Sequence, residues 1–142
     1  MDFRRVLRIG SCAAVCVISN PDRAPMWGIL ADVLSRFLPD QRNILDLSFV
    51  LADPQRLEDL FAGAGFRDIR VGREKRADII TGFDNYWDAI ETGTGSQPRL
   101  YFSLSEADRH SVREAVSTRL SRFESDGRLR MSVEMLIASG RA

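Results

Sequence analysis

The hydrophobic pattern starts with an unbroken apolar run at Cys12–Ile18, and Asn20 and Pro21 follow it closely. An apolar run this short that ends at a turn signal is typical of a strand buried on both faces, because a buried helix needs a longer run. The sequence therefore predicts a strand inside a covered sheet. Its two cysteines lie on one face of that strand, well separated along it, and we expect them to be buried free thiols.

Apolar residues at helical spacing predict about four helices in the rest of the chain. Asp22 or Asn20 is expected to cap the first helix, and Asp53 with its following proline opens the second. A short third helix is predicted near residues 83–90, and Ser105 begins a capping box that opens the fourth. The apolar stripes of the first, second and fourth helices are Met26, Leu30, Val33, Leu34 and Phe37; Leu57, Leu60, Phe61 and Ala64; and Val112, Ala115, Val116, Leu120 and Phe123.

Alternation of apolar and charged or polar residues predicts two further strands. One begins near Phe66 and continues to about residue 80, and the other has an apolar residue at every second position over the nine residues from Leu129 to Ile137. The chain thus has about three strands and four helices, with helices inserted between the last two strands. This pattern predicts a single α/β domain over residues 1–142, since a chain of this length supports one core.

Composition narrows the partners that fit such a domain. Hydrophobic residues make up 44% and charged residues 28%, which is ordinary for a globular protein. Lysine plus arginine and aspartate plus glutamate both number 20, so the net charge is zero, and neither nucleic acid nor an anionic membrane is expected as a partner. No segment approaches the roughly 20 apolar residues of a membrane span. The expected compartment is the cytoplasm.

The residue types needed for hydrolytic or metal chemistry are sparse. The single histidine, His110, lies among charged residues of a predicted helix, where a surface position explains it. With one histidine and no ligands near the cysteines, the sequence predicts neither a metal site nor a Ser-His-Asp device. The glycine pairs Gly63/Gly65 and Gly93/Gly95 indicate a helix stop and a turn-rich connector, not a nucleotide-binding loop. We therefore expect no catalytic, cofactor-binding or metal-binding residue.

Several stretches occur in a specific order and spacing. Residues 3–11 (Phe-Arg-Arg-Val-Leu-Arg-Ile-Gly-Ser) precede the apolar strand, and Met26-Trp27 follows it in the next helix. Residues 47–54 and 64–71 contain Leu-Ser-Phe-Val-Leu-Ala-Asp-Pro and Ala-Gly-Phe-Arg-Asp-Ile-Arg-Val. Together they resemble the C-terminal half of class I S-adenosylmethionine-dependent methyltransferases of the ubiquinone/menaquinone-biosynthesis type, the methyltransferase type 11 group. The chain departs from this family where the family's Pro-Gly-Gly turn is replaced by Ile-Gly-Ser.

The resemblance implies a partial Rossmann-like methyltransferase fold, with strands in the order 5-7-6 and the last strand antiparallel between its neighbours. It also implies that the N-terminal half, which holds the glycine-rich cofactor loop in the family, is missing. Six residues of this chain lie in segments that match those lining the family's acceptor pocket: Ser19, Asn20, Met26, Trp27, Tyr86 and Trp87. In the family, the segment matching Tyr86 and Trp87 forms a lid over the pocket. These six are the expected substrate-binding residues, and filling of the core is the alternative role for the aromatic ones.

We therefore expect a truncated methyltransferase-like protein that is not catalytic alone and binds no cofactor by itself. One alternative is a part of a split or mis-started small-molecule methyltransferase, which binds S-adenosylmethionine once a partner chain or an upstream segment supplies the other half. Another alternative is a homodimeric module that binds a small apolar ligand. Because an uncovered apolar strand invites association, we expect a homodimer formed through the Cys12–Ile18 edge or through the bare sheet face.

Overall fold

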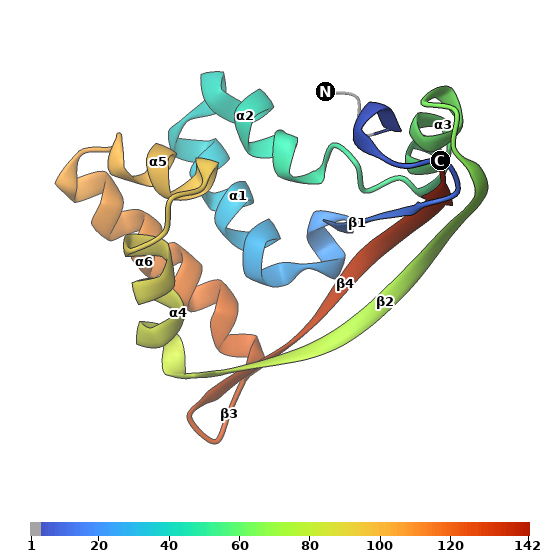
Figure 1. The fold of residues 1–142 in the computed structure, drawn as a ribbon. Helices are drawn as coiled ribbons and strands as arrows, with labels where there is room; N and C mark the ends of the chain where they lie inside the picture. The colour runs from blue at the N-terminus through green and yellow to red at the C-terminus, as the bar shows by residue number, and fades with distance from the viewer. Residues whose placement is uncertain (1–3) are drawn as a thin grey trace.

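The computed structural model describes residues 4–142 and has a mixed α/β architecture (Figure 1). Phe3, with which one of the family-like stretches begins, lies outside the described residues. The elements, with 3-10 turns marked η, are η1 (Arg4–Val6), β1 (Cys12–Ile18), η2 (Pro21–Arg23), α1 (Pro25–Phe37), η3 (Pro39–Gln41), α2 (Arg42–Asp46), η4 (Leu47–Phe49), α3 (Pro54–Gly63), β2 (Arg67–Thr81), α4 (Gly82–Glu91), α5 (Ser96–Phe102), α6 (Glu106–Leu120), η5 (Ser121–Phe123), β3 (Glu124–Ser125) and β4 (Arg128–Arg141).

The three long strands form a sheet in the order β1-β4-β2, and the short β3 pairs with β4 as a hairpin. β4 runs antiparallel to both β1 and β2. This strand order is the expected one, and α4 and α6 lie between β2 and β4 in the chain, as predicted. α5 (Ser96–Phe102) lies between them, where the sequence predicted a turn-rich connector. Within residues 4–142 only β4 pairs with β1, so the other edge of β1 is free.

β1 differs from the predicted strand buried on both faces. Val15 and Val17 pack against the α3 side of the sheet, but Ala14 and Cys16 on the opposite face are exposed. Cys12 and Cys16 are free and exposed, so the expectation of buried thiols is wrong. The reason is that a local apolar run predicts a strand but does not determine whether another helix or strand packs on each face of it.

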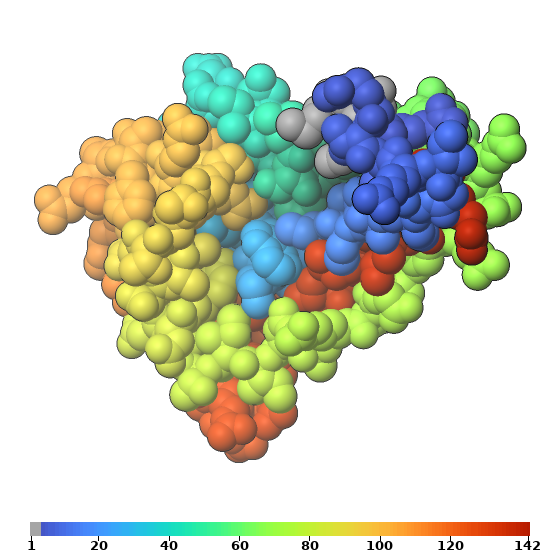
Figure 2. All heavy atoms as spheres, in the orientation of Figure 1, coloured from blue at the N-terminus to red at the C-terminus, as the bar shows by residue number. Residues whose placement is uncertain are grey.

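The uncovered face of the sheet is visible in Figure 2, where the atoms of β1, β4 and β2 lie side by side with no helix in front of them. Pairing across the strands places Cys16 beside Ile137 and Ile137 beside Gly72 on this face. Ile137 is 39% exposed, which is unusual for a large apolar side chain in a central strand. We call this surface the bare sheet face; it carries Ala14, Cys16, Gly72, Met135 and Ile137.

β4 changes its buried face halfway along. Leu129 and Met131 are buried among the helices, whereas Leu136 is buried against α3. Residues an odd number of positions apart point to opposite faces of a strand, so the two core clusters cover opposite faces of the sheet. Glu134 lies where the coverage changes side, and it is only 2% exposed. The predicted alternation therefore matches the observed burial only in the first half of the strand.

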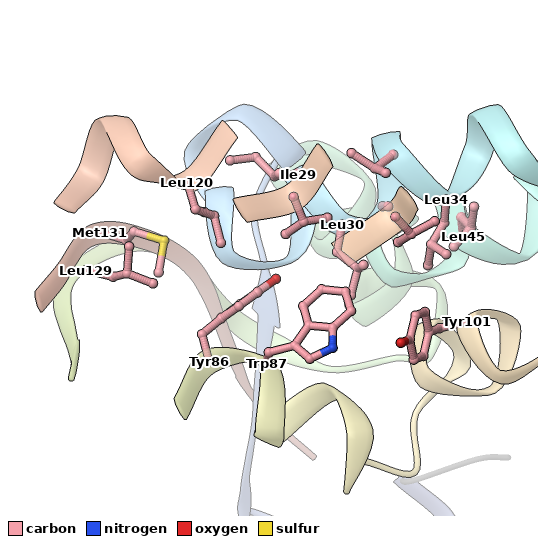
Figure 3. Packing of buried hydrophobic residues seen from close by; sticks show 14 residues of the cluster. Ile29, Leu30, Leu34, Leu45, Tyr86, Trp87, Tyr101, Leu120, Leu129 and Met131 are labelled. Atoms are coloured by element: carbon pink, nitrogen blue, oxygen red, sulfur yellow. The ribbon is translucent and has the colours of Figure 1, made fainter. Parts of the chain in front are cut away.

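The larger core cluster joins α1, α4, α5 and α6 to the first half of β4 (Figure 3). Leu30 of α1, Trp87 of α4 and Leu120 of α6 are each at most 1% exposed. Full burial of a large apolar side chain contributes roughly 1.5–3 kcal/mol, so this cluster is the main stabilising core. The smaller cluster surrounds Phe61 and Phe66, whose ring centroids lie 5.1 Å apart.

Two predicted helix caps are confirmed and one is wrong. The side chains of Asp53 and Ser105 each accept a backbone hydrogen bond at the starts of α3 and α6. α1 instead begins at Pro25 without a side-chain cap, because η2 separates it from Asn20 and Asp22. Within the described part of the chain, no helix is both long and apolar enough to cross a membrane.

Candidate functional site

A buried carboxylate lies where β1 ends against β4. Glu134, 2% exposed, accepts a hydrogen bond from the Ser19 hydroxyl at 2.8 Å. Arg23 Nη1 donates to its Oε2 at 3.0 Å, and Arg73 Nη1 donates to its Oε1, also at 3.0 Å. Three segments that are far apart in the sequence therefore meet at one carboxylate.

The backbone explains why these groups come together. The Ser19 N–H donates to the backbone carbonyl of Glu134 at 3.1 Å, which continues the β1–β4 ladder beyond the end of β1. On the other side of β4, Lys75 pairs with Glu134 in the β2 register. Arg73 lies two residues before Lys75 and so shares its face of the strand. The turn η2 then brings Arg23 back to the same carboxylate.

The surroundings of Glu134 hold it in the charged form. The hydrogen bond from Ser19 lowers its pKa most, burial acts in the opposite direction, and the hydrogen bonds from Arg23 and Arg73 lower it further. The pKa falls from an ordinary value of 4.5 to about 2. The two arginine side chains are 49% and 45% exposed, so they connect the buried carboxylate with the solvent.

A cavity of about 190 Å³ lies beside the carboxylate. Lys75, the single lysine of the chain, lines it, and its side chain makes no hydrogen bond or ion pair within residues 4–142. The full lining is Asp22, Arg23, Pro25, Lys75, Phe123, Ser132 and Glu134. This cavity therefore combines an unpaired cation, an already neutralised carboxylate and an apolar wall.

Four of the six residues expected to contact an acceptor surround the passage from β1 into α1. Ser19 is fully buried, whereas Asn20 is exposed. Met26 and Trp27 are partly exposed in the first turn of α1. These four residues lie close to the end of β1, and their contact with an acceptor stays a prediction.

Tyr86 and Trp87, the other two expected residues, lie in the core (Figure 3) and are 2% and 1% exposed. The Tyr86 hydroxyl donates to the Met26 carbonyl at 2.7 Å. The ring of Trp87 packs edge-on against Tyr101, with centroids 5.3 Å apart. Burial raises the pKa of Tyr86, which keeps its hydroxyl protonated as a donor. Packing accounts for both side chains without a lid, and their contact with an acceptor stays a prediction.

A second cavity, of about 520 Å³, lies between β1 and α3. All its lining residues are apolar, among them Val15 and Val17 from β1 and Leu57 and Phe61 from α3. The free edge of β1 borders this cavity. It therefore offers an apolar surface next to unpaired backbone groups.

The backbone groups at the free edge follow from the ladder. The Ser19 N–H donates to β4, and the Ser11 carbonyl accepts from the N–H of Ala142. In an antiparallel ladder, alternate residues point to the same neighbour, so the odd-numbered residues face β4. The residues whose N–H and C=O groups point to the free edge are the even-numbered ones: Cys12, Ala14, Cys16 and Ile18.

Sequence reasoning did not single out Glu134, Arg73 or Lys75. One signal was present, because Glu134 stands between Val133 and Met135 in an apolar part of the strand. A charge at such a position marks a group that is paired if it is buried. The identity of its partners has no local signal, since they come from other strands and turns.

The remaining candidates for metal or acid–base chemistry are surface residues. His110 lies on α6, is 73% exposed at its side chain and pairs with Glu114 at 3.3 Å. Across residues 4–142, no group of three or more histidine, cysteine, aspartate or glutamate side chains is placed to hold a metal ion.

No known protein-family model matches this chain, and no curated protein matches it either.

Proposed function

We propose that this chain is the acceptor-side part of a methyltransferase-like α/β fold and that it transfers no methyl group alone. The observation that supports this is the sheet order β1-β4-β2, with β4 antiparallel between two neighbours. The resembled family ends its sheet in the same order. Methyl transfer needs an acceptor aligned with the methylsulfonium of the cofactor and the exclusion of water. Residues that line only the acceptor side of the pocket supply neither.

The uncovered parts of the sheet are where a cofactor-binding part would attach. The free edge of β1 offers the backbone groups of Cys12, Ala14 and Cys16 to another strand. The bare sheet face offers apolar side chains such as Ile137 to covering helices. That part is carried by another polypeptide or by a longer form of this one, and it supplies the S-adenosylmethionine site. Ser19, Asn20, Met26 and Trp27 then lie on the acceptor side, at the end of β1.

Calorimetry with S-adenosylhomocysteine tests this proposal. The chain alone is expected to show no binding heat, whereas a complex with the N-terminal half of a type 11 methyltransferase is expected to bind at micromolar strength. Cys16→Pro is the variant that should block attachment at the free edge of β1, because it removes an N–H at that edge and leaves the hydrogen bonds to β4 in place. Cys16→Ala controls for the lost thiol. Binding by the chain alone, or equal binding by the Cys16→Pro complex, contradicts the proposal.

A second candidate function is a homodimeric module for a small apolar ligand, favoured by the apolar cavity between β1 and α3. Two copies of β1 are self-complementary, since an antiparallel pair of identical edges matches every donor with an acceptor. Light scattering at micromolar concentration separates the two candidates. A dimer that Cys16→Pro disrupts and Cys16→Ala preserves supports the homodimer, and a monomer excludes it.

A further inference from the structure

We propose that Lys75, Arg23 and Arg73 form a binding site for the carboxylate or phosphate group of a small molecule, next to the buried Glu134. This site is independent of the methyltransferase proposal, because it rests on charge, burial and shape within this chain. Its features are an excess of positive charge, guanidinium groups with unused donors, and a compact cavity.

The charges around the cavity do not cancel. The lining carries Arg23 and Lys75 against Glu134 and Asp22. Arg73 does not line the cavity, but it pairs with Glu134 and adds a third positive charge, so one positive charge remains. Glu134 already accepts bonds from both arginines. Asp22 is exposed, so water and salt screen it. The Lys75 side chain is therefore left without an anionic partner, and the net charge of the site is positive.

Glu134 holds the two arginines without using all their donors. A guanidinium has five N–H donors, yet Arg23 and Arg73 each reach Glu134 through Nη1 alone. Both side chains are about half exposed, so their remaining N–H groups are accessible to a second anion. Because the buried carboxylate fixes both guanidinium groups in advance, binding an anion costs little additional side-chain entropy.

The shape of the cavity limits the size of the ligand. Its volume is about 190 Å³, and its apolar walls are the buried Pro25 and the partly buried Phe123. Ser132, on the same face of β4 as Glu134, adds a hydroxyl. A compact molecule with one anionic end fits, with its apolar part on Phe123 and its anionic group between Lys75 and Arg23, while Arg73 reaches it from beyond Glu134.

The single lysine gives the site a selective probe. Reductive methylation with ¹³C-formaldehyde labels only Lys75 and the N-terminal amine, and it preserves both charges. In separate titrations with inorganic phosphate and with benzoate, the Lys75 signal is expected to shift and saturate with a Kd of roughly 1 mM. The N-terminal signal is the internal control. The two probes distinguish a bare phosphate group from a carboxylate that carries an apolar body.

Variants make the test specific to this site. Arg73→Gln is expected to weaken binding of the better probe roughly tenfold, as lost charge-assisted bonds do. Arg76→Gln is the matched control, because Arg76 lies on the same strand with an 83% exposed side chain and pairs with Asp78; its Kd is expected to stay unchanged. Lys75→Gln, read by calorimetry, breaks no bond of the described structure and is expected to fold normally and bind roughly tenfold more weakly.

The outcomes decide the proposal even if Arg73→Gln fails to fold, since Lys75→Gln then carries the test alone. Saturable binding that Lys75→Gln weakens and Arg76→Gln preserves supports the site. Equal binding by wild type and Lys75→Gln overturns it. Shifts of the Lys75 signal that never saturate, or that follow the N-terminal signal with both probes, overturn it as well.

Discussion

The hydroxyl of Ser19 and the carboxylate of Glu134 form a buried hydrogen bond of 2.8 Å that fastens the end of β1 to β4. The two residues are 0% and 2% exposed, so little solvent reaches the bond between them. Arg23 follows Ser19 in the next turn and binds the same carboxylate. The position of this arginine therefore depends on Ser19, whose side chain is fully buried.

Ser19→Ala is expected to lower the free energy of unfolding by about 1–3 kcal/mol, because it leaves a buried charged acceptor without one donor. Ser103→Ala is a suitable control, since the Ser103 hydroxyl is exposed and bonds the carbonyl of Leu100. Its effect is expected to stay within about 0.5 kcal/mol. Urea unfolding of both variants checks this, and equal stabilities count against the structural role of the Ser19 bond.

Glu134 also makes stability depend on pH. Its folded-state pKa is lowered, so its contribution is fully present above the ordinary value of 4.5 and is lost as the pH falls towards about 2. The charged groups facing it are Arg23, Arg73 and Lys75, with Asp22 on the same cavity. Glu134→Gln is expected to show a flatter decline of unfolding free energy between pH 5 and pH 2 than wild type.

The measurement is urea unfolding at several pH values across that interval. Glu114→Gln is the matched control, because this glutamate is 69% exposed and pairs only with His110 among the described side chains. Its pH profile is expected to follow the wild type. Parallel profiles for wild type and Glu134→Gln show that the carboxylate is not held in the charged form by folding.

Local signals were enough to predict much of this fold. The apolar run of β1, the Asp53 cap of α3 and the capping box at Ser105 depend on neighbours a few residues away, and each element was found where it was predicted. The candidate site depends on distant residues. Ser19 and Arg73 lie 115 and 61 positions from Glu134, so only the strand register brings them together.

The sequence also could not predict which faces of the strands and helices are covered by other elements. An apolar run such as Cys12–Ile18 fits a central strand and an uncovered edge strand equally well, because its composition does not record what packs on it. The same holds for Trp87: helical spacing places it on one face of α4, but a core and a lid both favour an aromatic residue there. The structure separates these roles through burial, with Trp87 1% exposed and Cys16 exposed.

Trp87→Ala is expected to lower the unfolding free energy by about 3–5 kcal/mol, as removal of a buried aromatic side chain does. Phe102→Ala, at a position 47% exposed, is expected to cost far less. Thermal or urea unfolding checks both. A Trp87→Ala variant as stable as wild type contradicts the core position and returns this residue to the acceptor site that the resemblance implies.

Disulfide formation by Cys12 and Cys16 can show whether two copies of the chain pair through the free edge of β1. Cys12 and Cys16 are four residues apart on one strand, about 13 Å at the usual rise, so they are too far apart for a disulfide with each other. If two copies pair antiparallel about Ala14, Cys12 lies opposite Cys16 of the second copy, with Cα atoms about 5.5 Å apart. Mild oxidation is then expected to trap a covalent dimer.

Non-reducing electrophoresis after oxidation checks this expectation. Cys16→Ser removes one thiol of each pair and is expected to abolish this crosslink while keeping the strand. A protein that stays monomeric on the gel under oxidation contradicts pairing in this register. A covalent dimer that persists in Cys16→Ser shows that the copies meet in another register, through Cys12 alone.

Gly28 packs so closely on the turn before α1 that a Cβ there would lie 2.1 Å from the carbonyl oxygen of Pro21. Backbone does not yield as a flexible side chain does, so Gly28→Ala must move α1 away from η2. Alanine favours a helix over glycine by about 1 kcal/mol, but we expect the overpacking to outweigh this and to lower the unfolding free energy by about 1–3 kcal/mol.

Gly63→Ala in α3 is the matched control, because a Cβ there meets nothing within 4 Å. It is expected to raise stability by up to about 1 kcal/mol through helix propensity alone. Urea unfolding of the two variants should therefore give changes of opposite sign. A Gly28→Ala protein as stable as wild type contradicts the close packing of α1 on η2, and with it the position of Arg23, which η2 holds beside Glu134.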